Sequence, residues 1–117
     1  MKQYTDESQT AKLILLGFEK PKSISGYYQR GPYEYDAETN AKMVVYDDTQ
    51  YPIYAYSIGE LISFLPDDGV SNKRLEFDCF HWFVDWDHFD KIHQTIQVEL
   101  VDALYDMILK LKEEGVI

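Results

Sequence analysis

Histidine and aspartate side chains, which can bind a metal ion or move a proton, gather in one short stretch of the sequence. Such groups can bind zinc or another divalent ion. On a strand, however, His81 and Asp85 would lie about 13 Å apart at about 3.3 Å per residue, too far to share one ion. Asp85 with Asp87 could still do so, as could His88 with His93 after a turn. The competing interpretation, which we prefer, is a solvated acidic strand end, because charged residues are mostly exposed. The residues concerned are His81, Asp85, Asp87, His88, Asp90 and His93.

A thiol also lies close to an imidazole in the sequence, in Cys79 and His81. A thiolate nucleophile needs a nearby base or cation. Alternate residues on one strand lie about 7 Å apart, beyond hydrogen-bond reach, and free cysteine is among the most buried residue types. We therefore predict that Cys79 is a small core residue. We also predict that the chain has no catalytic residue, no metal and no cofactor, and that it is not an enzyme.

Tyrosine is abundant, with ten copies in 117 residues. Such a small domain cannot bury both the ring and the hydroxyl of every tyrosine. Ordinary strand alternation would turn one ring of each pair inward and lay the other over the sheet. The alternative is an exposed tyrosine-rich patch, since tyrosine is a preferred contact residue at protein interfaces. The pairs are Tyr27 with Tyr28, Tyr33 with Tyr35, and Tyr54 with Tyr56.

The chain is acidic, with 11 basic and 21 acidic residues and a net charge of −10. Two blocks, residues 31 to 72 and 75 to 109, each carry a net charge of −7. Charge of this sign opposes binding to nucleic acid and to anionic membranes. It would suit a protein that imitates DNA and occupies the basic groove of a nucleic-acid-binding enzyme. It would equally serve to keep a small domain soluble.

The single cysteine excludes an intramolecular disulfide framework and fits a reducing compartment. The N-terminal residues contain no apolar segment of the kind found in signal peptides. No apolar run approaches the roughly 18 residues that a membrane span requires. We therefore predict a cytoplasmic protein.

Local patterns predict three helices. The first covers residues 6 to 16 and has a cap and an acidic first turn. Ser57 and Glu60 have the spacing of a capping box, which predicts a short helix over residues 58 to 65. A long apolar stripe predicts the last helix from about residue 98 to 114.

Strand patterns lie between these helices. Two short strands are expected within residues 24 to 36, followed by an antiparallel hairpin over residues 42 to 57. The aromatic stretch, residues 77 to 90, follows them. Its apolar residues change from one face of a strand to the other, which predicts a break at residues 79 to 81. Residues 88 to 94 should return as a loop or a short further strand. We assign the large apolar residues of this stretch mainly to packing; they are Phe77, Cys79, Phe80, Trp82, Val84 and Trp86.

These elements predict one α+β domain over residues 1 to 117. Its antiparallel sheet of about four to six strands should pack against the N-terminal and C-terminal helices. The short central helix should close one end of the sheet.

Three segments of the sequence resemble segments of other small proteins. They read AKLILLGFEKP at residues 11–21, YSIGELISFLP at 56–66 and LVDALYDMILKLKEEGVI at 100–117. The chain resembles a group of small uncharacterised proteins encoded by phages, prophages and mobile elements of gut bacteria. The shared segments are helix caps and apolar stripes, so the resemblance implies a context and carries over no catalytic residue.

We therefore predict a non-enzymatic acidic interaction protein of a phage or mobile element that binds a host or element protein. The action could be inhibitory, through an imitation of DNA. The alternative is a small-molecule- or metal-binding domain that uses residues 77–93. The candidate binding residues are Tyr33, Tyr35, Tyr54, His81, Asp85, Asp87 and His88.

Overall fold

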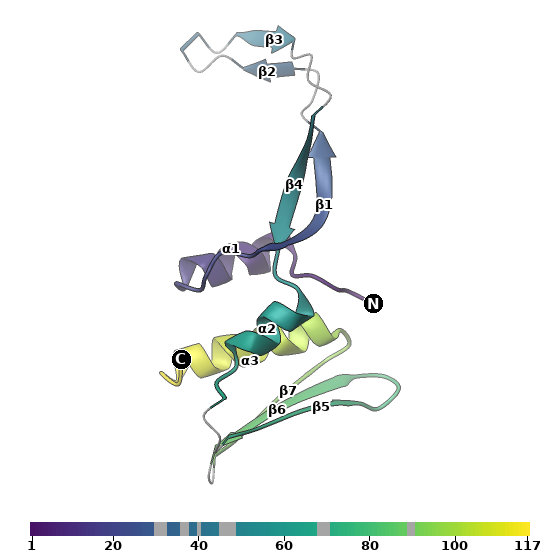
Figure 1. The fold of residues 1–117 in the computed structure, drawn as a ribbon, viewed down its shortest axis with the longest axis vertical. Coiled ribbons are helices and arrows are strands. Elements are labelled where there is room, and N and C mark those ends of the chain that lie inside the picture. Colours follow the sequence, from purple (N-terminus) through teal and green to yellow (C-terminus); the bar gives the residue numbers. More distant parts are fainter. Residues whose placement is uncertain (30–32, 36–37, 40, 45–48, 68–70, 89–90) are drawn as a thin grey trace. The chain divides into compact units, whose positions relative to one another are not determined.

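The computed structural model describes residues 1–29, 33–35, 38–39, 41–44, 49–67, 71–88 and 91–117. Within these residues the chain forms three helices and seven strands (Figure 1). The helices are α1 (Glu7–Leu15), α2 (Ile58–Phe64) and α3 (Leu100–Glu113). The strands are β1 (Ser23–Gln29), β2 (Tyr33–Tyr35), β3 (Lys42–Val44), β4 (Gln50–Ala55), β5 (Asn72–Phe77), β6 (Trp82–His88) and β7 (Lys91–Gln97).

The chain divides into two compact units. Unit 1 consists of Met1–Ser23 and Ala55–Ile117, and unit 2 is the segment Ile24–Tyr54 between them. Unit 1 holds all three helices and the strands β5, β6 and β7. The predicted α+β class with antiparallel strands is confirmed, whereas a single domain over the whole chain stays a prediction.

Unit 1 is built on a three-stranded antiparallel sheet in the order β5–β6–β7. The strand β6 lies in the middle, with Leu75 of β5 and Thr95 of β7 opposite its Val84. The helix α3 packs against β6 and β7, and α2 packs against α3 (Figure 1). The thirteen buried residues of the core come from all three helices and from β6, together with Tyr56 and Leu65 beside α2.

The prediction of one sheet with four to six strands is wrong. Besides the sheet of unit 1, β1 pairs with β4 and β2 pairs with β3, each as a separate two-stranded sheet. The predicted hairpin over residues 42 to 57 is wrong too, because β3 and β4 have different partners. Strands β2 and β3 pair in an antiparallel register, with Tyr33 opposite Val44 and Tyr35 opposite Lys42. The pair β1–β4 then forms outside the pair β2–β3.

All three helices lie where the sequence predicted them, and the reason is local. Asp6 accepts a hydrogen bond from Gln9 N–H at 2.8 Å, which caps α1. This bond lowers the pKa of Asp6 most strongly. Burial raises the pKa and the charge of Lys2 lowers it again, so the pKa lies below its usual value. The predicted capping box of α2 is also present, with Glu60 N–H donating to Ser57 Oγ at 3.2 Å.

Glu60 does more than cap α2. Its carboxylate accepts from the backbone N–H of Ser57 at 3.1 Å and of Lys22 at 3.0 Å, and from the hydroxyl of Ser23. Burial raises the pKa of Glu60, but these hydrogen bonds outweigh it and leave the pKa below its ordinary value. The carboxylate therefore ties the segment before β1 to the start of α2.

Replacing Glu60 by glutamine should lower the free energy of unfolding by about 1 kcal/mol at neutral pH. Because the folded-state pKa is lowered, the carboxylate's contribution is complete above the ordinary glutamate pKa of about 4.3. It is lost as the pH falls through the folded-state value. Urea unfolding of both proteins from about pH 7 to pH 3 should show the two stabilities converging in acid. A difference that stays constant with pH would contradict this role, and Glu113→Gln, at an exposed position of α3, serves as the control.

The aromatic stretch between β5 and β6 is less buried than predicted. The break at residues 79 to 81 is confirmed, since β5 ends at Phe77 and β6 begins at Trp82. Val84 and Trp86 are buried as expected, but Phe77 is 54% exposed and Phe80 is 75% exposed. The helix α3 packs against β6 and β7, and Phe77 lies on β5. The ring of Phe77 still stacks on that of Trp82, with the centroids 5.0 Å apart, whereas the assignment of Phe80 to packing is wrong.

Candidate binding surfaces

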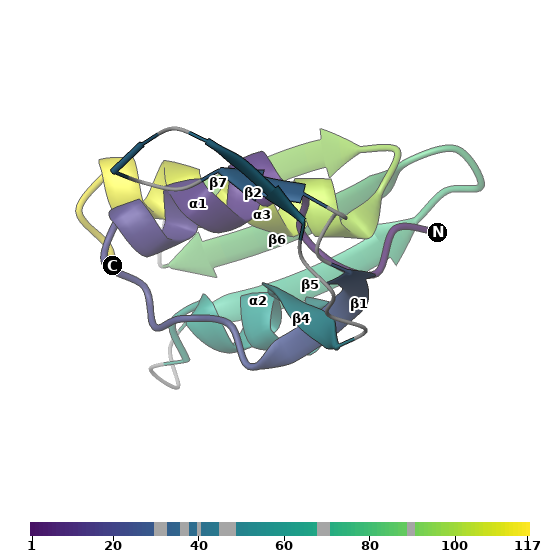
Figure 2. The ribbon, with the colours of Figure 1, turned by 90° about the horizontal axis from the view of Figure 1, so that it is seen from above.

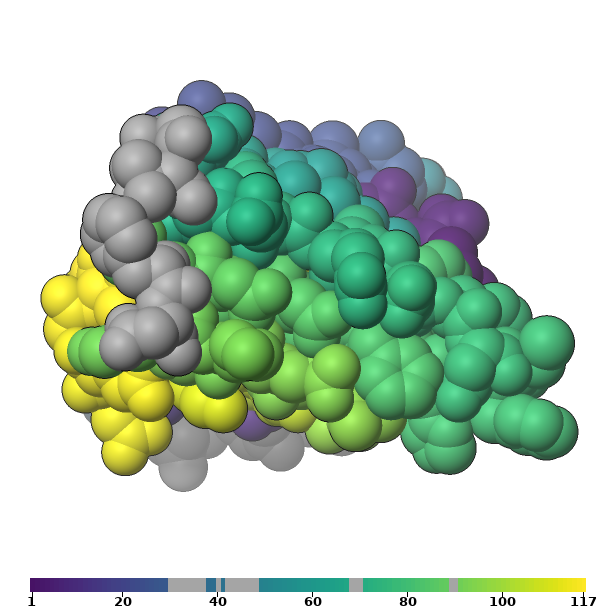
Figure 3. All heavy atoms as spheres, turned by 90° about the horizontal axis from the view of Figure 1, so that it is seen from below, coloured from purple at the N-terminus to yellow at the C-terminus, as the bar shows by residue number. Residues whose placement is uncertain are grey.

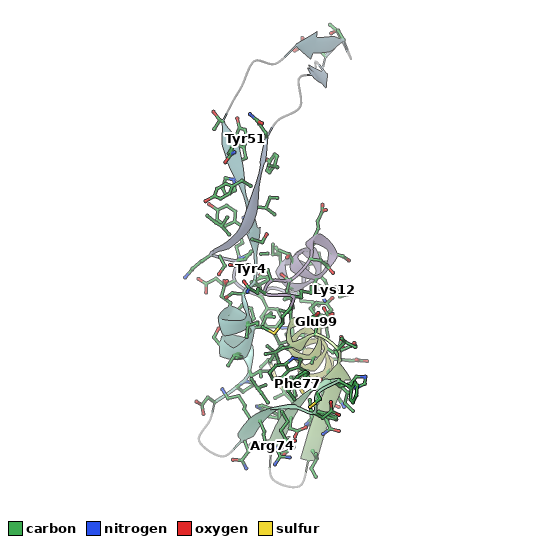
Figure 4. The ribbon with its side chains drawn as sticks, turned by 90° about the vertical axis from the view of Figure 1, so that its right-hand side faces the viewer. Tyr4, Lys12, Tyr51, Arg74, Phe77 and Glu99 are labelled. Carbon is green, nitrogen blue, oxygen red and sulfur yellow. The ribbon has the colours of Figure 1, made fainter. Side chains whose placement is uncertain are left out.

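One face of the sheet in unit 1 points away from α3. Successive residues of a strand point to opposite faces. Val84 and Trp86 belong to the core, so Phe83, Asp85 and Asp87 point to the outer face. Arg74 and Phe77, labelled on β5 in Figure 4, belong to opposite faces for the same reason. The strands of this sheet are green in Figure 3. The pairing sets three rows across the outer face: Asn72–Asp87–Ile92, Arg74–Asp85–Gln94 and Glu76–Phe83–Ile96.

Asp85, a predicted binding residue, is buried in the middle row of this face. Only 7% of Asp85 is exposed. Its Oδ2 lies 3.5 Å from Arg74 Nε, and its Oδ1 accepts a hydrogen bond from Gln94 Nε2 at 2.8 Å. The prediction that Asp85 belongs to a solvated strand end is therefore wrong, because β6 is a central strand and its neighbours cover the carboxylate.

Asp87 lies two residues further along the same face, and it is half-buried. Its Oδ1 is shielded from solvent and accepts no hydrogen bond within the part of the chain that the structure describes. Asp85 and Asp87 therefore share a face, as the alternation predicted. Of the two, Asp85 has its charge balanced by Arg74, whereas no cation in the described part of the chain pairs with Asp87.

The predicted histidines do not join these carboxylates. His81 is exposed before the start of β6, whereas His88 is its last residue, so they lie at opposite ends of the strand. The ring of His88 stacks on Trp86 with the centroids 5.7 Å apart, and its Nδ1 lies 2.8 Å from Ser71 Oγ. His93 is buried on the helix-facing side opposite Trp86. No three His, Cys, Asp or Glu side chains in the described ranges are grouped so as to hold a metal ion.

Cys79 is exposed, so its predicted place in the core is wrong. It lies in the turn between β5 and β6 with a φ of 81°. Asp78 Oδ1 accepts hydrogen bonds from the backbone N–H of Phe80 at 2.9 Å and of His81 at 2.7 Å. The bonds from His81 and then Phe80 hold the pKa of Asp78 below its usual value. The carboxylate of Asp78 therefore stabilises the turn by accepting backbone hydrogen bonds. The thiol of Cys79 lies in this turn, outside the strands, and is exposed.

The ribbon formed by β1 and β4 exposes its tyrosines. Tyr27 is 60% exposed and Tyr28 is 52% exposed, although neighbouring residues of a strand point to opposite faces. Tyr54, a predicted binding residue on β4, is also exposed, whereas Tyr56, which is two residues further along the sequence, is fully buried. Tyr28 stacks on Tyr51, labelled in Figure 4, with ring centroids 5.5 Å apart.

One ring of the pair Tyr54 and Tyr56 is buried and the other is exposed, but Tyr56 lies beyond the end of β4, so strand alternation is not the cause. For Tyr27 and Tyr28 both rings are exposed, and the prediction of one ring inward is wrong. Tyr33 and Tyr35, the remaining predicted pair, form β2 and pair with Val44 and Lys42 of β3. Their side chains lie outside the described part of the structure.

The exposure of Tyr27 and Tyr28 agrees with the alternative left open by the sequence, an exposed tyrosine-rich patch. A pocket beside β7 that includes His93 and Glu114 was missed from the sequence. These two residues are far apart in the sequence pattern, and only the packing of α3 brings them together.

Comparisons with protein families, with curated proteins and with solved structures found no match to this chain. None of the helices in the described ranges is long and apolar enough to cross a membrane. The resemblance to phage and mobile-element proteins stays a prediction, so the function has to be argued from the surfaces themselves.

Proposed function

We propose that this chain is a non-enzymatic protein-binding module whose β1–β4 ribbon contacts the partner. One observation carries the proposal. Of the residues in unit 2 whose side chains the structure describes, none is buried. The apolar side chains of this ribbon therefore have no core of their own to enter. The most exposed of them are Ile24, Tyr27, Tyr28, Ile53 and Tyr54.

Such a ribbon has low stability in isolation, and its exposed tyrosines suit it to bind another protein. A single two-stranded hairpin is marginally stable in water, because it has too little apolar area to bury. Tyrosine is enriched at protein interfaces, where it brings a large contact area at a small cost in conformational entropy. A partner that covers Tyr27 or Tyr28 would supply the burial that unit 2 lacks.

The class of partner follows from charge and from the resemblance. A net charge of −10 disfavours nucleic acid and anionic membranes, and the exposed tyrosines favour a protein surface. The resemblance to phage and mobile-element proteins makes a bacterial host protein, or another protein of the element, the expected partner. Imitation of DNA is less well supported, because Asp85 is buried beside Arg74 and cannot present its charge to a basic groove.

The ribbon can be tested with a double variant in which Tyr27 and Tyr28 are replaced by serine. Tagged wild-type protein should retain a specific protein from a bacterial lysate, identified by mass spectrometry and then purified. The double variant should bind this protein at least about tenfold more weakly, since exposed aromatic anchors dominate interface energies. The matched control replaces two exposed apolar residues of unit 1, Phe80 and Ile96, by serine and should bind normally.

Two outcomes would count against the proposal. If the control variant lost binding and the tyrosine variant kept it, the contact would belong to unit 1. If binding weakened steeply with added salt while both variants bound normally, the acidic surface would be the contact and imitation of DNA would be favoured. Circular dichroism of each variant shows whether unit 1 remains folded.

A further inference from the structure

A second surface feature lies in unit 1, between β7 and the C-terminal end of α3. The two elements run side by side (Figures 1 and 2). A pocket of about 480 Å³ opens between them. This volume is within the range of small-molecule sites. Its lining is Lys91, Ile92, His93, Lys110, Glu114 and Val116.

His93 and Glu114 form a pair whose hydrogen bonds fix its charge. His93 is buried, and its Nδ1 lies 3.2 Å from the backbone carbonyl oxygen of Trp86. A carbonyl can only accept, so Nδ1 carries a proton and donates it. Nε2 in turn is hydrogen-bonded to the carboxylate of Glu114. That bond requires one more proton, carried either by Nε2 or by the carboxyl group. With both bonds made, the pair is therefore neutral overall.

The remaining charged groups of the pocket are both lysines. Lys91 is the first residue of β7 and is exposed, whereas Lys110 lies in the last turn of α3 and is half-buried. Across the ranges that the structure describes, neither ammonium group makes an ion pair. The pocket thus has a positive charge in a chain whose net charge is −10. A cationic pocket on an acidic protein attracts small anions locally while the rest of the surface repels large ones.

We propose that this pocket binds a small oxyanion, the phosphate or carboxylate group of a small molecule. The ammonium groups of Lys91 and Lys110 would donate charge-assisted hydrogen bonds to its oxygen atoms. His93, held at both ring nitrogens, and Glu114 form a rigid floor. Val116 gives the pocket an apolar wall, which can contact a short hydrocarbon part of the ligand.

The test uses the full chain labelled with ¹⁵N and two probes, inorganic phosphate and butyrate. Titration of either probe, followed by amide chemical shifts, should move the signals of Ile92, Lys110 and Val116 together in a saturable way. The variant in which Lys91 and Lys110 are both replaced by glutamine should bind about tenfold more weakly for each lysine lost. The control replaces Lys12 and Lys20, exposed lysines outside the pocket, by glutamine and changes the net charge equally.

The outcomes separate the sources of the anion and decide the proposal. Saturable binding of phosphate alone assigns a phosphate site, and binding of butyrate alone assigns a carboxylate site. The proposal is overturned if neither probe shifts these signals, or if the control variant weakens binding as much as the pocket variant does. Because the pocket and the ribbon belong to different units, either result leaves the test of the ribbon unchanged.

Discussion

Replacing Trp86 by alanine should lower the free energy of unfolding by about 3 to 5 kcal/mol. Trp86 is buried in the middle strand of the sheet, and its ring contacts the rings of both His88 and His93. Its Nε1–H also donates to the carbonyl oxygen of Pro66 at 3.1 Å, which ties the end of the α2 segment to the sheet. Alanine would leave a cavity and remove that bond.

Phe80→Ala is the matched control for this result. Phe80 belongs to the same aromatic stretch but is 75% exposed, so its removal should change the stability by no more than about 0.5 kcal/mol. Both variants can be measured by chemical denaturation followed by far-ultraviolet circular dichroism. Similar losses at Phe80 and Trp86 would show that the turn packs against something, contrary to the structure.

Replacing Thr5 by valine should cost about 2 to 3 kcal/mol, although the two side chains have nearly the same shape. Thr5 is buried, and its Oγ1 accepts a hydrogen bond from Tyr56 N–H at 3.0 Å. Thr10 Oγ1 donates to the Asp6 carbonyl at 2.7 Å, so Thr5 is the donor in its 2.7 Å bond to Thr10. Valine would leave a buried N–H without an acceptor and a buried hydroxyl oxygen without its donor.

Thr95→Val is the control for this prediction. It tests whether the cost comes from the hydrogen bonds of Thr5 to Thr10 and Tyr56 or from the loss of any threonine hydroxyl. Thr95 Oγ1 donates to the carbonyl oxygen of Ala103 at 2.7 Å. That carbonyl lies within α3, where the helix supplies another donor, so valine at this position should cost only about 1 kcal/mol. Thermal unfolding of the two variants gives the comparison. Equal costs at Thr5 and Thr95 would argue against the chain of hydrogen bonds beside Tyr56.

The helices were predictable because their signals are local. A cap and its partner lie three residues apart, as in Ser57 and Glu60, so the start of such a helix can be recognised from a few neighbouring residues. The break between β5 and β6 was predictable for a similar reason, since the change of face is visible in consecutive residues. Element type and position therefore follow from neighbours in the sequence.

Strand partners and burial were not predictable, because they depend on residues far apart in the sequence. Asp85 looks like a solvated carboxylate until Arg74 and Gln94 are placed on either side of it. Tyr27 and Tyr28 look like an alternating pair, and alternation buries one of them only where a second layer covers the strand. The same consideration applies to Phe77, which lies on the edge strand β5 and is 54% exposed although its ring stacks on Trp82.

The single cysteine has a practical consequence. Cys79 is the only thiol in the chain, and it is exposed in the turn between β5 and β6. A maleimide dye would therefore attach at one known position without any engineered residue. That position is in unit 1, whereas the tyrosines proposed to bind a partner are in unit 2. The native protein can thus carry a fluorescent reporter while its tyrosine ribbon remains unaltered.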